Sequence, residues 1–195
     1  LENKIINLKE NEYEEIIKKK DEKGADISKA MISNMRNILK SVFLTRDEVS
    51  DLVYFVEDDY LHKENAISEM LFTFEKIASQ INQDIFICPA DYPYLYSKIE
   101  DTKIFIGNKI HWRTVRETLI TFLTSKKMVL KHWDNFISLG TTRHHPMEKK
   151  LHEIYEKEYC FSPIPSLAMH TTNINSAYGI PPNYDWKKNW EDNEI

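Results

Sequence analysis

Three consecutive acidic residues, Glu57, Asp58 and Asp59, directly follow the apolar run 52–56. Such a run, rich in β-branched and aromatic residues, is typical of a strand buried on both faces at the centre of an α/β sheet. Open α/β sheets bind ligands at the carboxyl ends of their strands, and adjacent carboxylates repel one another unless a cation or hydrogen-bond donors compensate them. The triplet therefore predicts a site for Mg²⁺ or Mn²⁺ that binds phosphates. The alternative is a solvated acidic turn before the next helix.

A second group of metal-binding residue types consists of His144, His145, Glu148 and His152. Glu148 and His152 are four residues apart and would share one face of a helix. The His-Glu-x-x-His pattern of zinc hydrolases is absent. An amphipathic helix is therefore a simpler interpretation of this group than a zinc hydrolase.

Composition limits the classes of protein that the chain can belong to. Its 195 residues fit one domain, which we place over 1–195, and a hydrophobic fraction of 42% suffices for a folded core. With 26 Lys and Arg against 31 Asp and Glu, the net charge is -5, so we expect no nucleic-acid partner. Only 4 glycines occur, and the sequence contains neither a dinucleotide-binding nor a P-loop pattern.

The sequence also carries signals about the compartment. Cys88 and Cys160 lie in apolar stretches and predict buried free thiols in a reducing environment. No apolar run reaches the roughly 18 residues that a transmembrane helix needs. No apolar segment follows the first residues, as a signal peptide would require. We therefore expect a cytoplasmic protein without a transmembrane segment, and peripheral contact with a membrane stays open.

Helical and strand patterns alternate along the chain and predict an α/β fold, with a mixed sheet flanked by helices and added hairpins. Strands are expected at 4–8, 52–56, 84–88, 103–106 and 112–122. Helices are expected from an Asn11 cap to Lys20, from an Asp26 or Ser28 cap to Ser41, and at 65–79, 130–139 and 147–158. The segment 160–195 is rich in Pro, Asn, Tyr and Trp and shows little periodicity.

Four motifs occur in order between Gly24 and Trp186. They are Tyr54–His62 (YFVEDDYLH), the turn Asp91–Pro93, the segment His111–Phe122 that begins HWRT, and the segment Phe161–Thr171 that ends in His-Thr. As an ordered set they resemble glycosyltransferases of the GT-A fold, especially a family-2-like branch found in bacteria and viruses. The resemblance implies a GT-A-like fold for nucleotide-diphospho-sugar transfer, with Glu-Asp-Asp as this branch's version of the Asp-x-Asp metal motif.

The resemblance implies roles for individual residues. Asp59 as direct ligand, Asp58 and the late histidine His170 would hold Mn²⁺ or Mg²⁺ against the diphosphate of a sugar nucleotide. Glu57, Asp58 and Arg113 would bind the nucleotide-sugar donor. The sugar and acceptor pocket would include Trp112, His111 and Tyr92. Glu148 is the first candidate for the base and Asp91 the second. An inverting transfer needs that base to take the proton of the acceptor hydroxyl.

We expect a metal-dependent glycosyltransferase of the hexosyltransferase type. A UDP-sugar is the default donor, and a glycan, a lipid-linked group or a protein supplies the acceptor hydroxyl. The alternatives are a nucleotidyltransferase that uses the same acidic metal site and a non-catalytic GT-A-like binding module. GT-A enzymes usually begin with a strand and loop that hold the nucleotide base, and the stretch before Gly24 is short for both. Part of the N-terminal nucleotide-binding strand is therefore expected to be reduced here or to lie upstream of Leu1.

Overall fold

The computed structural model describes residues 6–9, 11–97, 99–175 and 179–194. Its main sheet contains the strands Leu52–Phe55 (β1), Phe86–Ile87 (β3), Ile104–Ile106 (β4), His111–Val115 (β5), Phe122–Ser125 (β6) and Cys160–Ile164 (β7). These six strands lie in the order β1-β6-β3-β7-β5-β4. The β3–β7 pair is parallel and the other neighbours are antiparallel, so the sheet is mixed, as the sequence predicts.

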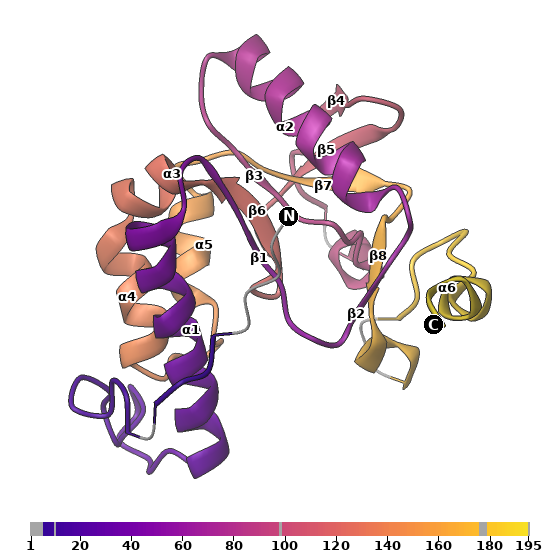
Figure 1. The fold of residues 1–195 in the computed structure, drawn as a ribbon. Helices are drawn as coiled ribbons and strands as arrows, with labels where there is room; N and C mark the ends of the chain where they lie inside the picture. The colour runs from indigo at the N-terminus through magenta and orange to yellow at the C-terminus, as the bar shows by residue number, and fades with distance from the viewer. Residues whose placement is uncertain (1–5, 10, 98, 176–178, 195) are drawn as a thin grey trace.

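Helices flank this sheet on both faces. They are Lys29–Glu48 (α1), Ala66–Ile81 (α2), Lys126–Lys131 (α3), Trp133–Thr141 (α4), Lys149–Tyr155 (α5) and Trp186–Asn193 (α6). Figure 1 shows α1, α3, α4 and α5 grouped on one side and α2 above the other. Phe86, Phe122 and Phe136 belong to the core on the first side, whereas Met70 of α2 and Trp112 belong to the core on the second.

Local sequence explains where α1 begins and how closely it packs. The Ser28 side chain caps the helix by accepting a hydrogen bond from the Met31 N–H at 3.2 Å. The buried residues Met35 and Leu39 then face α4. A Cβ at Gly140 would lie 2.4 Å from Leu39 Cγ, so the absent side chain permits the close approach of α1 and α4. This packing fixes α1 beside the sheet.

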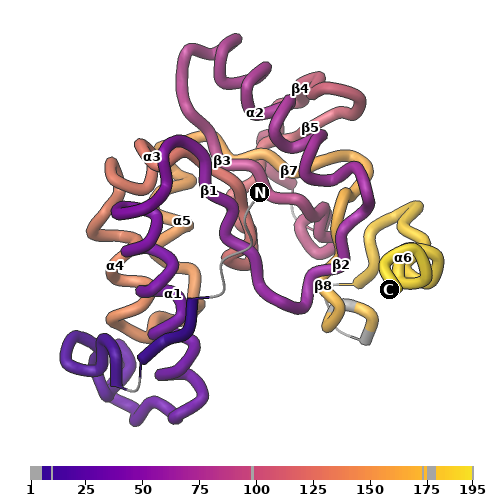
Figure 2. Tube along the Cα trace, viewed as in Figure 1, coloured from indigo at the N-terminus to yellow at the C-terminus, as the bar shows by residue number. Residues whose placement is uncertain are grey.

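A second, two-stranded sheet positions the residues after β1. Tyr60–His62 (β2) pairs antiparallel with Ala168–His170 (β8), and Tyr60 lies opposite His170 in the register. The backbone N–H of Thr171 also donates to the Asp59 carbonyl at 2.8 Å. Figure 2 traces the short path from the end of β1 into β2 beside β8. The pairing therefore brings two segments more than 100 residues apart against each other.

The position of β1 differs from the prediction. The apolar run 52–56 forms a strand, but β1 lies at the edge of the sheet and its four residues are only half-buried. Its neighbour is β6, and none of the described residues forms a strand on its outer side. A continuous apolar run can therefore mark an edge strand when other elements cover its faces, as Phe136 of α4 does by stacking on Phe55.

The strand and the helix expected near the N-terminus are not found in the described residues. Residues 4 and 5 of the expected strand 4–8 lie outside the described residues, and 6–8 are not in a strand. The expected helix from Asn11 to Lys20 does not form, and 11–16 is a series of turns. Asn11 and Tyr13 have positive φ angles of 61° and 66°, which a right-handed helix excludes. The Arg36 guanidinium instead binds the carbonyls of this segment.

The expected strand 112–122 is two strands. β5 ends at Val115 and β6 begins at Phe122, and the chain between them turns with positive φ at Leu119 and Ile120. The remaining expected elements exist with shifted ends: α1 continues past Ser41 to Glu48, and the expected helix 130–139 is α3 followed by α4.

The C-terminal segment is more ordered than its lack of periodicity predicts. It contains β7, β8 and α6, together with the short 3-10 helix Thr171–Asn175 (η2). Earlier in the described chain, Pro93–Ser97 forms another 3-10 helix (η1). No helix in the described ranges has the length and apolar character needed to cross a membrane.

Candidate metal centre

Glu57, Asp59 and His170 converge where β1 ends, and we call these three residues the β1 cluster. His170 Nε2 lies 2.7 Å from Asp59 Oδ2 and 3.9 Å from Glu57 Oε2. One ligand atom from each residue falls within 4.8 Å of the other two. The pairing of Tyr60 with His170 produces this arrangement, because it holds the histidine beside the residue that precedes β2. Two carboxylates and an imidazole form a donor set that can hold a divalent ion, in which the carboxylate oxygens suit Mn²⁺ or Mg²⁺ and the imidazole suits a transition metal.

The electrostatics of the β1 cluster favour a cation. Burial raises the pKa of Glu57, and the neighbouring Asp59 carboxylate raises it further. The Asp59 Oδ1 atom is buried and has no hydrogen-bond partner within the described chain. It therefore keeps lone pairs that a metal ion can use. On the other side of the imidazole, His170 Nδ1 lies 2.6 Å from Thr172 Oγ1, a contact that orients the ring as supporting groups do in metal sites.

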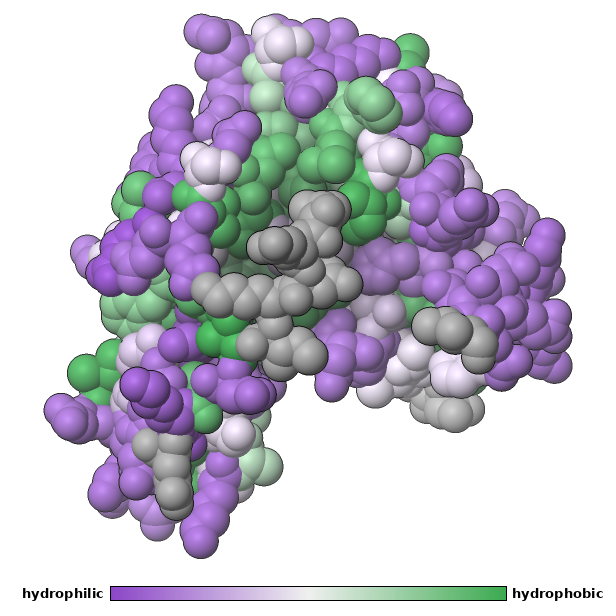
Figure 3. All heavy atoms as spheres, viewed as in Figure 1, coloured by the Kyte–Doolittle hydropathy of each residue, from purple (hydrophilic) through white to green (hydrophobic). Residues whose placement is uncertain are grey.

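The β1 cluster borders a cavity of about 590 Å³ between α1 and the sheet. Asn34, Asn37 and Ser41 of α1 form a polar wall, and Glu57, Asp58 and Asp59 close one end. The sheet side is apolar and includes Val53, Phe55, Ile120 and Phe122. On the face drawn in Figure 3, hydrophobic residues gather in the middle, over the sheet, and hydrophilic residues cover the helices at either side. Asp58 is exposed on this rim and is not one of the three converging residues.

Glu117, Glu148 and His152 form a second convergence of potential ligands, which we call the α5 cluster. Here the protein itself supplies partners for the oxygens. Glu148 Oε2 accepts hydrogen bonds from the N–H groups of Thr118 and Ile120 at 3.4 and 3.3 Å, and its Oε1 lies 3.3 Å from His152 Nε2. The Glu148 side chain is only 7% exposed. The interaction with this carboxylate raises the pKa of His152, although burial opposes it.

Asp91, the second candidate for the base, forms an ion pair with Arg113, a candidate for binding the nucleotide-sugar donor. Its Oδ1 accepts hydrogen bonds from Arg113 Nε and Nη2 at 3.1 and 2.9 Å, and both side chains are buried. Tyr96 donates its hydroxyl to Asp91 Oδ2 at 2.6 Å. The Arg113 guanidinium also lies 4.2 Å from the centre of the Tyr96 ring. Asp91 and Arg113 thus neutralise each other beside β5 and η1.

The expected acceptor residues occupy three different environments. Trp112 is fully buried under α2, where it lies too close to Gly107 to leave room for a Cβ. Tyr92 is also buried, and its hydroxyl contacts that of Tyr60 and donates to the Thr118 carbonyl. His111 is exposed at the start of β5. The structure therefore places His111 within reach of a ligand and the two aromatic residues in the core.

The group of residues from His144 to His152 is divided. His144 and His145 bind acidic residues of the N-terminal segment, with His144 Nδ1 3.1 Å from Glu22 Oε2 and His145 Nε2 2.7 Å from Asp21 Oδ2. These contacts hold residues 21–22 against the turn before α5. Glu148 and His152 face the interior instead, so the four residues do not form one site.

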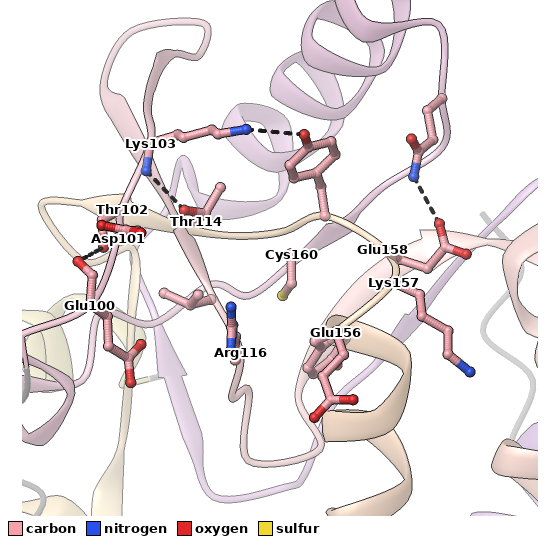
Figure 4. A pocket seen from close by; sticks show the side chains of 14 residues that line it. Glu100, Asp101, Thr102, Lys103, Thr114, Arg116, Glu156, Lys157, Glu158 and Cys160 are labelled. Carbon is pink, nitrogen blue, oxygen red and sulfur yellow. Dashed lines mark hydrogen bonds between the residues drawn. The ribbon is translucent and has the colours of Figure 1, made fainter.

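A second cavity, also of about 590 Å³, opens at the opposite edge of the sheet from the β1 cluster. Figure 4 shows that its walls come from the segments 100–103 and 156–160, with Arg116 between them. Positively and negatively charged side chains line it, and no residue of the β1 cluster or the α5 cluster belongs to its lining. Nothing in the sequence patterns predicts this cavity.

Sequence reasoning missed Glu117 as a neighbour of Glu148 and Thr172 as a partner of His170. The spacing of Thr172 two residues after His170 was the one available signal.

No protein-family model matches the chain, and no curated protein sequence matches it significantly.

Proposed function

We propose that the protein is a metal-dependent glycosyltransferase with a GT-A-like fold, whose cation binds at the β1 cluster and holds the diphosphate of a nucleotide-sugar donor. The observation that carries the proposal is the convergence of Glu57, Asp59 and His170 beside a cavity, with a buried Asp59 oxygen that lacks a hydrogen-bond partner in the described chain. Most buried side-chain oxygens in proteins have a hydrogen-bond partner, so an Asp59 oxygen without one supports a binding role. The proposed ion is Mn²⁺ or Mg²⁺, because the carboxylates of Glu57 and Asp59 suit both ions.

The walls of the cavity support a donor with both polar and apolar faces. Amide and hydroxyl groups of Asn34, Asn37 and Ser41 can bind the hydroxyls of a ribose or sugar. The apolar side offers a surface for a ring face, and the acidic end holds the cation. A divalent ion there would neutralise the charge that develops on the leaving diphosphate as the bond to the sugar breaks.

Glu148 is the proposed base for the acceptor hydroxyl, since Asp91 is occupied by Arg113. The charge of Glu148 contributes, after burial and nearer groups, to raising the pKa of Glu57, so the two carboxylates lie within electrostatic range. His111 is exposed and is the proposed contact for the acceptor. The proposed acceptor is a hydroxyl of a glycan, of a lipid-linked group or of a protein, and the proposed location of the reaction is the cytoplasm. Arg113, Trp112 and Tyr92 would then support the site by shaping it rather than by touching the sugar.

Thermal unfolding with a panel of nucleoside diphosphates and sugar nucleotides, each with and without Mn²⁺, tests the proposal. A ligand present at about 100 times its Kd adds about 2.7 kcal/mol of stability, which for a chain of this size raises Tm by about 5–10 °C. We expect a rise that requires both Mn²⁺ and one nucleotide. The absence of a rise with every nucleotide would contradict a donor site and favour the non-catalytic alternative.

Product analysis then separates the two transferase classes. A glycosyltransferase releases a nucleoside diphosphate, whereas a nucleotidyltransferase attacks the α-phosphate and releases pyrophosphate. We expect the diphosphate, and pyrophosphate would overturn the assignment of the reaction while leaving the metal site in place.

A further inference from the structure

The ring of His170, the histidine of the β1 cluster, is held in one orientation by contacts on two sides. Its Nδ1 lies 2.6 Å from Thr172 Oγ1. The Tyr60 ring packs against one face, with 4.9 Å between the ring centres, because the β2–β8 pairing sets Tyr60 opposite His170. The imidazole side chain is only 14% exposed. These contacts leave Nε2 as the ring nitrogen that faces the carboxylates of the cluster.

Nε2 is therefore the atom that His170 offers to a cation. It lies 2.7 Å from Asp59 Oδ2 and 3.9 Å from Glu57 Oε2. A histidine that binds a metal through one ring nitrogen usually donates the hydrogen of the other to a supporting group, and this bond fixes both the tautomer and the ring orientation. Thr172 Oγ1 can accept that hydrogen, since a hydroxyl accepts as well as donates.

Thr172 is placed for this role by the backbone around it. It is the second residue of η2, directly after β8, and the N–H of the preceding Thr171 donates to the Asp59 carbonyl at 2.8 Å. The Thr172 side chain is exposed, and within the described chain its hydroxyl bonds to His170 alone. Exposed side chains contribute little to the stability of a fold. The contact of Thr172 with the ring therefore bears on what His170 binds rather than on folding.

We propose that Thr172 is a positioning residue that turns Nε2 of His170 towards the ion, and that the β1 cluster prefers a first-row transition ion such as Mn²⁺ or Co²⁺ to Mg²⁺. Mg²⁺ binds oxygen ligands and gives up its waters reluctantly, so it gains little from an imidazole. A transition ion gains from the ring nitrogen, and the gain increases from Mn²⁺ to Co²⁺. The inference rests on the metal centre of the proposed function and names the class of ion, which the carboxylates alone leave open.

Isothermal titration with Mn²⁺, Co²⁺ and Mg²⁺ tests the proposal on the wild type, Thr172→Val and Thr172→Ser. Valine keeps the shape of threonine but cannot accept a hydrogen from Nδ1, whereas serine keeps the hydroxyl. We expect Thr172→Val to bind Mn²⁺ and Co²⁺ about tenfold more weakly than the wild type and Mg²⁺ with nearly the same affinity. Thr172→Ser is expected to bind all three ions as the wild type does.

Thr171→Val is the matched control. It removes a neighbouring hydroxyl that forms no hydrogen bond with the described residues, and it keeps the backbone N–H that donates to Asp59. Its affinities for the three ions are expected to equal those of the wild type. The visible absorption of bound Co²⁺ depends on its ligands, so the spectrum should change in Thr172→Val and stay the same in Thr171→Val. Far-ultraviolet circular dichroism and urea unfolding of each variant confirm that the fold is retained.

The outcomes separate this inference from the proposed function. A wild type that binds none of the three ions would overturn both the inference and the proposed metal centre. A wild type that binds Mg²⁺ as tightly as Mn²⁺ and Co²⁺ would overturn the inference alone. So would a Thr172→Val variant whose affinities for the three ions are unchanged or fall equally, or a Thr172→Ser variant that loses as much as Thr172→Val.

Discussion

The β1 cluster and the α5 cluster contain the same ingredients, two carboxylates and a histidine, but differ in what surrounds the oxygens. In the α5 cluster the Glu148 carboxylate accepts two backbone N–H groups and Glu117 accepts the Tyr94 hydroxyl at 2.7 Å, whereas His152 Nε2 lies 3.3 Å from Glu148 and makes no hydrogen bond within the described chain. In the β1 cluster the Asp59 side chain is 35% exposed beside a cavity, and one of its oxygens has no partner in the described chain.

The contrast shows that residue type alone does not distinguish a binding site from a structural one. A carboxylate whose lone pairs are filled by the protein holds the fold together, and one with lone pairs left over can bind a cation. Glu148 holds the turn in which Leu119 and Ile120 have positive φ, a conformation that is costly for a β-branched residue such as Ile120. We therefore expect the α5 cluster to govern stability, in addition to supplying Glu148 as the proposed base, and the β1 cluster to govern metal affinity.

The largest effect on stability is expected from Glu148→Ala. The substitution leaves the N–H groups of Thr118 and Ile120 without their buried acceptor, which costs about 1–3 kcal/mol. Glu148→Gln keeps an acceptor oxygen and is expected to cost less. Asp59→Ala serves as the matched control and is expected to stay within about 0.5 kcal/mol of the wild type, since its site is half-exposed. Urea unfolding measures all three, and equal losses for Glu148→Ala and Asp59→Ala would remove the distinction.

His170→Ala is expected to have a smaller effect, and the property that it changes is the affinity for Mn²⁺ instead of stability. Loss of the imidazole donor should weaken Mn²⁺ binding about tenfold, which corresponds to about 1.4 kcal/mol. Its counterpart His152→Ala should leave Mn²⁺ binding unchanged. Isothermal titration of both variants with Mn²⁺ makes the comparison, and a weakened His152→Ala beside an intact His170→Ala would reverse the assignment of the two clusters.

The smallest effect is a pH dependence of stability that depends on His152. Because its pKa is raised in the folded state, mainly by Glu148 and also by Glu117 and Glu156, it stabilises the fold below its unfolded pKa. That contribution is lost as the pH rises through the folded pKa. The difference in Tm between wild type and His152→Gln should therefore be larger at about pH 6 than at about pH 8. In a Glu148→Gln background the difference should shrink, and a difference that grows with pH would contradict the interaction.

The sequence predicted where the candidate site lies better than it predicted which residues converge there. Glu57–Asp59 lies at the end of a strand as expected, because an apolar run that stops at charged residues marks a strand end well. The proximity of His170 followed only from a family resemblance, since it depends on the β2–β8 register between distant segments. Glu117 joins Glu148 through a turn with positive φ angles, which no pattern of residue types specifies.

The same division holds for the fold. The mixed sheet with flanking helices followed from alternating patterns, but the edge position of β1 depends on which strands pair, and pairing is not local. The charge order of 11–20 favoured a helix that does not form. Of this segment Ile17 is the buried hydrophobic residue, and a short helix needs a whole apolar face packed against a neighbour to be stable.

A titration of the protein with Mn²⁺, followed by isothermal calorimetry, tests the central claim most directly. The wild-type chain and Glu117→Gln are expected to bind one Mn²⁺ with equal affinity, and Asp59→Asn is expected to lose at least about tenfold in affinity while unfolding at the same urea concentration. Equal binding by the wild type and Asp59→Asn, or loss of binding in Glu117→Gln alone, would contradict a metal centre at the β1 cluster.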